Sequence, residues 1–210
     1  MPNITNHKDT MRKMTLNGRG QITVDPDLAI IRIGVQTTGD NVTETQSENA
    51  RISQNVIDAL KLVGIDEIQT RQYRIEKLYD YVNGAQIDRG YEVRNVVEIR
   101  TGDIEHLGTI IDTAVYNGAN VVDSIQFTLS DPDAYYQQAL NLAVDNAISK
   151  AENIAYNLGV LTSPIPMLIT ENYINAIPFS NTVAMRGEIA TPIESGDIQV
   201  IANVTVEFEY

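Results

Sequence analysis

"SDPDAYYQQALNLAVDNAISKAENIAYNLG", residues 130–159, contains the longest helix that the sequence predicts. Asp131 suits the N-cap, Pro132 the first helical position, and Asp133 the first turn, where a carboxylate meets the positive end of the helix dipole. Alanine then recurs at every fourth position, and a row of small side chains lets a helix lie close to its neighbour. The stretch therefore predicts a helix over 132–158 that lies flat on a sheet or on a partner helix, and the glycine after it ends the helix.

Three segments alternate apolar and polar residues with a period of two, which is the pattern of a half-buried strand. They are residues 14–24, 28–38 and 198–210, and the last is the most regular. The Gly-Arg-Gly triplet at 18–20 resembles a phosphate-binding loop, but that loop needs a helix directly after it, whereas a strand continues here. We therefore expect these glycines to mark a bulge or a close backbone contact.

The middle of the chain predicts a long hairpin between two helices. Residues 68–100 form its arms, and Asn-Gly at 83–84 is a strong signal for a type I′ turn. Helical patterns cover 41–63 before the hairpin and 103–117 after it, and a strand over 121–129 follows.

These elements predict an α+β fold with a mostly antiparallel sheet, a long β-hairpin and helices packed on one face, in the order ββαββαβαβ(β). We expect a disordered tail over 1–13 and a single domain over 14–210. The hairpin at about 68–100 is expected to protrude from that domain as a subdomain.

Charge and composition exclude several classes of partner. The chain has 15 Lys and Arg against 28 Asp and Glu, a formal net charge of −13, so nucleic acid and anionic membranes would meet a repulsive field. It has no cysteine, which removes thiol chemistry, Cys-ligated metals and disulfides. The first 14 residues hold no apolar run, so they predict neither a signal peptide nor a membrane anchor. We expect a cytoplasmic protein, or a periplasmic or extracellular one if a signal peptide was removed.

Candidate catalytic and metal-binding residues are few. The chain contains Asp-Pro-Asp twice, at 25–27 and at 131–133. Because carboxylates are metal ligands, these four aspartates are candidates for a metal site. A hard cation needs more converging oxygens than these supply, whereas a strand link and a helix cap explain both motifs. His106 is the only histidine outside the tail and is expected on a helix surface. The sequence therefore predicts no catalytic residue, no metal and no cofactor.

Tyrosines gather in the hairpin of a chain that has no Trp and only three Phe. Cross-strand packing explains such a cluster, and so does an interface, where tyrosine is enriched. Both explanations stay open. The candidate interface residues are Tyr73, Tyr79, Tyr81 and Tyr91, with Asn83 and Gly84 at the turn.

Residues 171–196 form a long stretch without a regular pattern, and loops of that length often serve a function. If this stretch is a lid over a ligand, Arg186 and Glu188 are the polar groups expected to act in it.

Several motifs occur in an order that resembles the SIMPL-domain family. They are "GRGQITVDPDLAIIRIGVQT", "GYEVRNVVEI", "GANVVDSIQFTLSDPDAYYQQAL" and "KAENIAYNLGV", and the resemblance covers residues 16–210. It implies a protein linked to envelope or stress physiology that assembles into homo-oligomers, as some bacterial members form large rings. It implies no catalytic residues. An animal relative resembles an adaptor that binds a kinase.

Our leading hypothesis is a non-enzymatic scaffold or binding protein that assembles with copies of itself. The first alternative is a small-ligand binder or hydrolase that uses the 171–196 loop as a lid. The second is an adaptor for another protein, with an exposed tyrosine patch. None of the three involves nucleic acid or insertion into a membrane.

Overall fold

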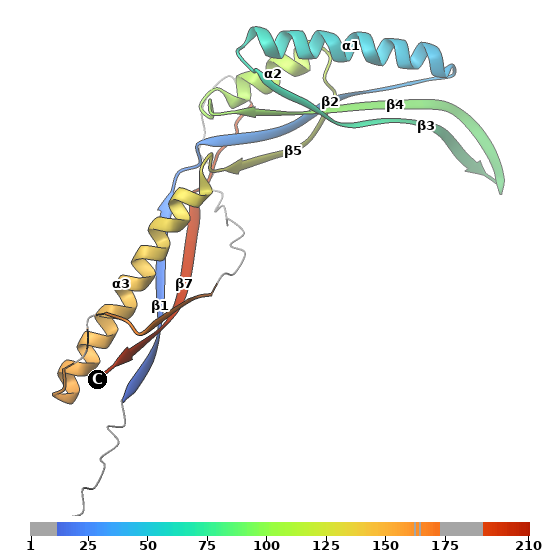
Figure 1. Ribbon diagram of the computed structural model, residues 1–210. Helices are drawn as coiled ribbons and strands as arrows, with labels where there is room; N and C mark the ends of the chain where they lie inside the picture. Colours follow the sequence, from blue (N-terminus) through green and yellow to red (C-terminus); the bar gives the residue numbers. More distant parts are fainter. Residues whose placement is uncertain (1–11, 162, 164, 173–190) are drawn as a thin grey trace, which may run out of the picture. The chain divides into compact units, whose positions relative to one another are not determined.

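A computed structural model describes residues 12–161, 163, 165–172 and 191–210 (Figure 1). In this part of the chain three helices and seven strands follow one another in the order ββαββαβαββ, as predicted. The contacts divide them into two compact units. Among the described residues, the first unit comprises those within 12–24, 131–172 and 197–210, and the second those within 25–130 and 191–196.

The first unit is a three-stranded antiparallel sheet with one long helix. Its strands are β1 (Lys13–Val24), β6 (Leu168–Glu171) and β7 (Ile198–Glu209), in the order β1-β7-β6, and its helix is α3 (Pro132–Leu158). β7 lies in the middle and pairs on both sides, which explains why the last strand has the most regular alternation in the sequence.

Helix α3 lies against this sheet through its alanine row, as expected. The Cβ of an alanine at position 18 would lie 2.0 Å from the carbonyl oxygen of Ala143, and one at position 20 would lie 1.9 Å from that of Ala139. Gly18 and Gly20 are thus the close backbone contact that the sequence predicted, because any side chain there would push the helix away. The buried row on the helix consists of Ala139, Ala143, Ala147, Ala151 and Ala155.

The same helix also reaches the edge strand of the sheet. The Nζ of Lys150 donates to the backbone oxygen of Asn17 at 2.7 Å, and the Oδ1 of Asn146 accepts from the backbone N–H of Arg19 at 3.3 Å. An edge strand leaves such backbone groups unpaired, so these side chains satisfy part of the β1 edge.

The second unit is a four-stranded antiparallel sheet with two helices on one face (Figure 1). The strands follow the order β3-β4-β2-β5. Their bounds, and those of the helices, are β2 (Leu28–Gly39), α1 (Val42–Leu62), β3 (Glu67–Val82), β4 (Ala85–Thr101), α2 (Leu107–Tyr116) and β5 (Val121–Thr128).

The core of this unit lies between the helices and one face of β2 and β4. Every second residue of these strands points into it, among them Ile31, Ile33 and Ile99, and Leu60 of α1 and Ile111 of α2 meet them there. Apolar residues therefore alternate along both strands because one face of each strand is buried, as the sequence pattern predicted.

Asn49 of α1 is a polar exception within the buried face. It is fully buried, and its Nδ2 donates to the backbone oxygens of Val35 and Val93, both at 3.0 Å. A buried amide without partners would be costly, so these two bonds allow Asn49 to fasten α1 to β2 and β4 at once.

Some boundaries differ from the prediction. Helix α2 begins at Leu107 rather than at 103, because the side chain of Asp103 accepts from the backbone N–H of His106 and holds those four residues in a turn. β1 begins at Lys13, the last residue of the expected tail. The rest of that tail, apart from Arg12, and residues 173–190 lie outside the described residues. The single domain over 14–210 stays a prediction, since two units built from interleaved segments can fold as one.

Candidate interaction site

The end of the β3–β4 hairpin extends beyond the rest of its sheet (Figure 1). β2 pairs with β4 only as far as Gly39 opposite Tyr91, and residues 77–91, which we call the arm, continue as two strands. The arm starts beside Gly90, whose φ is 86° and where a Cβ would lie 2.5 Å from the Gly39 oxygen. Its turn is at Asn83 and Gly84, with φ of 53° and 82°, so the two positive φ values of the predicted type I′ turn are present.

The hairpin tyrosines fall into two groups. The Nζ of Lys77 lies 5.4 Å from the centre of the Tyr79 ring and 5.7 Å from that of Tyr91, so one cation lies between two rings of opposite strands. These two tyrosines therefore fit the cross-strand explanation. Tyr81 near the tip is 73% exposed, and Tyr73 on β3 is also exposed, as an interface would require.

The arm carries no net charge, although the chain as a whole carries −13. Its two cations and two anions pair across the strands: Lys77 with Asp88 at 2.8 Å, and Arg89 with Asp80 at 3.0 Å. The hydrogen bond between Lys77 and Asp88 raises the pKa of the lysine and lowers the pKa of the aspartate. Both groups are therefore charged at neutral pH, and the arm presents neutral, tyrosine-rich surface.

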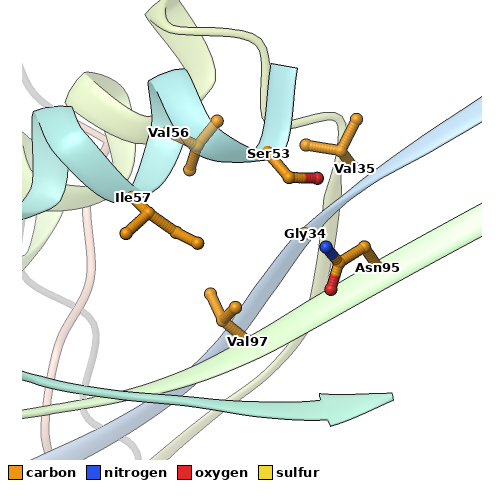
Figure 2. A pocket seen from close by; sticks show the side chains of 7 residues that line it. All are labelled: Gly34, Val35, Ser53, Val56, Ile57, Asn95 and Val97. Atoms are coloured by element: carbon orange, nitrogen blue, oxygen red, sulfur yellow. The ribbon is translucent and has the colours of Figure 1, made fainter. Parts of the chain in front are cut away.

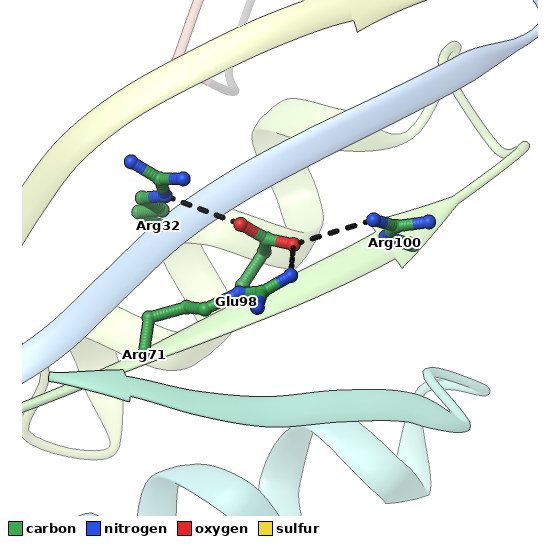
Figure 3. A network of polar contacts seen from close by, with 4 residues as sticks. All are labelled: Arg32, Arg71, Glu98 and Arg100. Carbon is green, nitrogen blue, oxygen red and sulfur yellow. Dashed lines mark hydrogen bonds and ion pairs between the residues drawn. The ribbon is translucent and has the colours of Figure 1, made fainter.

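A second site lies on the opposite face of the four-stranded sheet from the helices. There the carboxylate of Glu98 meets three guanidinium groups, which we call the arginine cluster (Figure 3). The contacts are Arg71 Nη2 to Oε1 at 2.6 Å, Arg32 Nε to Oε2 at 3.2 Å, and Arg100 Nη2 to Oε1 at 3.6 Å.

Glu98 is only 4% exposed, although it lies on the outer face of β4. It is buried because three long side chains from β2, β3 and β4 cover it. The hydrogen bond from Arg71, followed by that from Arg32, lowers the pKa of Glu98 from 4.5 to about 2, against the opposing effect of burial. The carboxylate therefore stays ionised throughout the neutral range.

A small cavity lies between α1 and the sheet (Figure 2). It has a volume of about 10 Å³, room for one water molecule, and it is lined by Gly34, Val35, Ser53, Val56, Ile57, Asn95 and Val97. The Oδ1 of Asn95 is buried there without a hydrogen-bond partner in the structure. This cavity suits a single bridging water and is too small for an organic substrate.

The Asp-Pro-Asp motifs have separate structural roles. Asp27 accepts from the backbone N–H and the Oγ of Ser130, both at 2.6 Å, while Asp131 caps α3 by accepting from the backbone N–H of Ala134 at 3.1 Å. In the part of the chain that the structure describes, no three His, Cys, Asp or Glu side chains are grouped as a metal would need.

The remaining candidates offer no site in the described residues. The exposed His106 ring bonds to Asp103 at 2.8 Å, which raises the pKa of the histidine. Arg186 and Glu188, the expected lid residues, lie outside the described part of the chain. None of the described helices is long and apolar enough to cross a membrane.

Sequence reasoning identified the tyrosine hairpin but missed the arginine cluster. Arg71 and Arg32 stand 27 and 66 residues from Glu98 in the chain, and only strand register brings them together. The signal available was the pattern of β4, where Glu98 alternates with Val97 and Ile99. That pattern places Glu98 on the outer face but does not indicate which side chains cover it.

The fold and these sites define the class of molecule: an α+β protein with two antiparallel sheets, whose outward features are a tyrosine-rich hairpin and an arginine cluster. The chain belongs to the SIMPL family, described as "Protein of unknown function (DUF541)", whose model matches residues 14–208. The resemblance drawn from the sequence motifs is thereby confirmed.

Proteins similar to this chain include the 26 kDa periplasmic immunogenic protein of Brucella melitensis. It is 26% identical over 215 residues, which cover 94% of this chain and 84% of the relative. The uncharacterized protein YggE of Escherichia coli is 28% identical over 141 residues, covering 66% of this chain and 57% of the relative. YggE of Edwardsiella ictaluri is 25% identical over 152 residues, covering 71% and 64%.

Proposed function

We propose that this protein is a non-enzymatic scaffold that assembles with copies of itself, and that the arm makes the contact between subunits. The observation that carries the proposal is the exposed, tyrosine-rich and electrically neutral surface of residues 77–91. Tyrosine is enriched where proteins meet, and an isolated two-stranded hairpin is marginally stable without a partner.

Charge explains why the arm is suited to self-contact. Two copies of a chain with a net charge of −13 repel each other, most strongly where acidic side chains face each other. The arm neutralises its own charges through the pairs Lys77–Asp88 and Arg89–Asp80. Contact through the arm therefore brings two copies together with little repulsion.

The small number of catalytic groups supports the non-enzymatic part of the proposal. The chain has two histidines and no cysteine, and the cavity between α1 and the sheet has room for one water molecule. The Brucella relative is named a periplasmic protein. For this chain we propose a role in envelope or stress physiology. Fractionation of cells that naturally produce the protein tests whether it lies in the periplasm or in the expected cytoplasm.

Light scattering on purified protein tests the assembly. We expect a mass that is a multiple of 23.3 kDa at micromolar concentration, and a smaller mass after Tyr81→Ser. Tyr116→Ser is the matched control, because this tyrosine is 91% exposed at the end of α2 and lies outside the arm. Its mass should equal that of the unmodified protein.

Two outcomes would overturn the proposal. One is a clean monomer at micromolar concentration, and the other is an assembly that the arm variant leaves unchanged. A monomer whose arm variant loses binding to a different protein would favour the adaptor hypothesis instead.

A further inference from the structure

We propose that the arginine cluster, Arg32, Arg71 and Arg100 around Glu98, is a binding site for a divalent oxyanion of the phosphate class. The site is independent of the arm and of the assembly proposed above, since it lies on the outer face of the four-stranded sheet and shares no residue with the arm.

The charge balance of the cluster favours an anion. Three guanidinium groups surround one carboxylate, and among the described residues Glu98 is the only acidic side chain within 4 Å of any of them. Glu67 faces Arg100 across the β3–β4 ladder but is not paired with it. The cluster therefore carries an excess of two positive charges in a strongly acidic chain, which matches the charge of a divalent anion.

The hydrogen-bonding capacity of the cluster is largely unused. A guanidinium group has five N–H donors, yet Arg32 and Arg71 each direct one hydrogen bond to Glu98. Within the described part of the chain, Arg100 makes only the longer ion pair. The three side chains are between 42% and 52% exposed, so the other donors are open to solvent. Guanidinium forks bind phosphate and carboxylate oxygens through paired hydrogen bonds.

Glu98 holds the cations in place before a ligand arrives. Its two oxygens accept hydrogen bonds from arginines of different strands, β2 and β3, and the strand register fixes the backbone positions of those arginines. Its low pKa, about 2, keeps it charged at every physiological pH. The arginines are therefore gathered permanently, and binding an anion costs little reordering.

Three positions beside the cluster on this face carry polar, uncharged side chains, although Glu67, opposite Arg100, is acidic. Ser124 of β5 lies opposite Arg32, Gln126 follows on the same face of β5, and Gln69 of β3 lies opposite Glu98. Hydroxyl and amide groups can donate to an oxyanion, and no carboxylate at these positions competes with it.

Titration of the whole protein with inorganic phosphate, followed by calorimetry at constant ionic strength, tests the site. We expect saturable binding of phosphate and of sulfate, and binding of acetate at least tenfold weaker because it carries a single charge. Arg100→Gln should weaken phosphate binding about tenfold, since it removes a donor fork and one charge. This residue is chosen because Glu98 keeps both of its hydrogen bonds when Arg100 is removed.

The control is Arg51→Gln, because Arg51 is an exposed arginine already paired with one carboxylate, Glu48, at 2.7 Å. It should leave phosphate binding unchanged. Should Arg100→Gln fail to fold, Arg100→Lys serves in its place, since it keeps the charge and loses only the fork, and a weaker loss of affinity is expected. Three results would overturn the proposal. They are a phosphate affinity in the Arg100 variant equal to that of the unmodified protein, a loss of phosphate affinity in Arg51→Gln equal to that in the Arg100 variant, and phosphate binding that does not saturate.

Discussion

The carboxylate of Asp27 accepts two hydrogen bonds from Ser130, one from its backbone N–H and one from its Oγ, each 2.6 Å long. The two residues lie 103 positions apart, just before β2 and just after β5. The longest segment of the second unit runs from Asp25 to Ser130, so this pair ties the two ends of that segment together.

Removing this pair should destabilise the second unit. Asp27→Ala loses both bonds and should lower the free energy of unfolding by about 1 kcal/mol, whereas Ser130→Ala loses only the bond from Oγ and should cost less. The double variant should cost little more than Asp27→Ala alone. Urea unfolding of the three variants measures this. Asp25→Ala is the control, as it removes the other carboxylate of the same motif, and a fully additive double variant would contradict the pairing.

The Asp27 pair also predicts a pH dependence. The hydrogen bond from the Ser130 hydroxyl, followed by that from its backbone, lowers the pKa of Asp27 below its ordinary 3.8. The folded state thus favours the ionised form, so the stabilisation is complete above pH 3.8 and is lost as the pH falls through the lower folded pKa. The stability difference between the unmodified protein and Asp27→Asn should accordingly narrow in strong acid.

The contact between α3 and β1 predicts that Gly18 cannot be replaced. Gly18→Ala places a Cβ 2.0 Å from the Ala143 oxygen, and should lower the free energy of unfolding by about 3 kcal/mol, the upper end for overpacking. Gly102→Ala is the matched control, because its nearest neighbour, the Asp27 oxygen, would lie at 3.4 Å. Denaturant melts compare the two, and a tolerated Gly18→Ala would mean that α3 does not lie on this strand.

Loss of the α3 N-cap should lower the free energy of unfolding by less than the Gly18 substitution does. Asp131→Ala removes the bond to the Ala134 N–H and should cost about 1 kcal/mol, typical of a lost N-cap. Asp133→Ala, in the first turn of the same helix, loses only the favourable interaction with the helix dipole, roughly 0.5 kcal/mol. Thermal unfolding followed by circular dichroism distinguishes them; the reverse order would contradict the assigned cap.

Glu98→Gln should destabilise the sheet in a pH-dependent way. The variant loses charged hydrogen bonds to two arginines, which we expect to cost about 2 kcal/mol at neutral pH. Since the folded pKa lies near 2 and the ordinary value is 4.5, this contribution is complete above pH 4.5 and disappears as the pH falls towards 2. Unfolding curves from pH 7 to pH 2 measure it, and a constant difference would show that Glu98 is not ionised in the folded state.

Local patterns predicted the elements because each depends on residues close together in the chain. Asp131 and Pro132 begin α3, Gly159 ends it in the left-handed region with φ of 65°, and Asn41 caps α1 by accepting from Thr43 N–H and Glu44 N–H. The start of α2 was placed four residues too early because Asp103 competes for the backbone of His106, a side-chain contact that hydrophobic spacing does not reveal.

The sequence predicted the candidate sites less completely than the helices and strands, because one of the sites depends on contacts between distant segments. The tyrosine hairpin is local, so its turn and its exposed residues could be found from an Asn-Gly pair and composition. The arginine cluster depends on the register of β2, β3 and β4, and a shift of one residue would turn Glu98 to the other face. No spacing in the chain encodes that register.

By itself, then, the sequence determined the strands, the three helices, both ends of α3 and the motifs that mark the SIMPL family. Only the tertiary structure decided that Glu98 is buried beneath three arginines, that Asp27 bonds to Ser130, and that Gly18 and Gly20 make room for the alanines of α3. The division has a physical basis: dihedral preferences and hydrophobic periodicity act over a few residues, whereas side-chain partners are set by strand pairing and helix packing between distant segments.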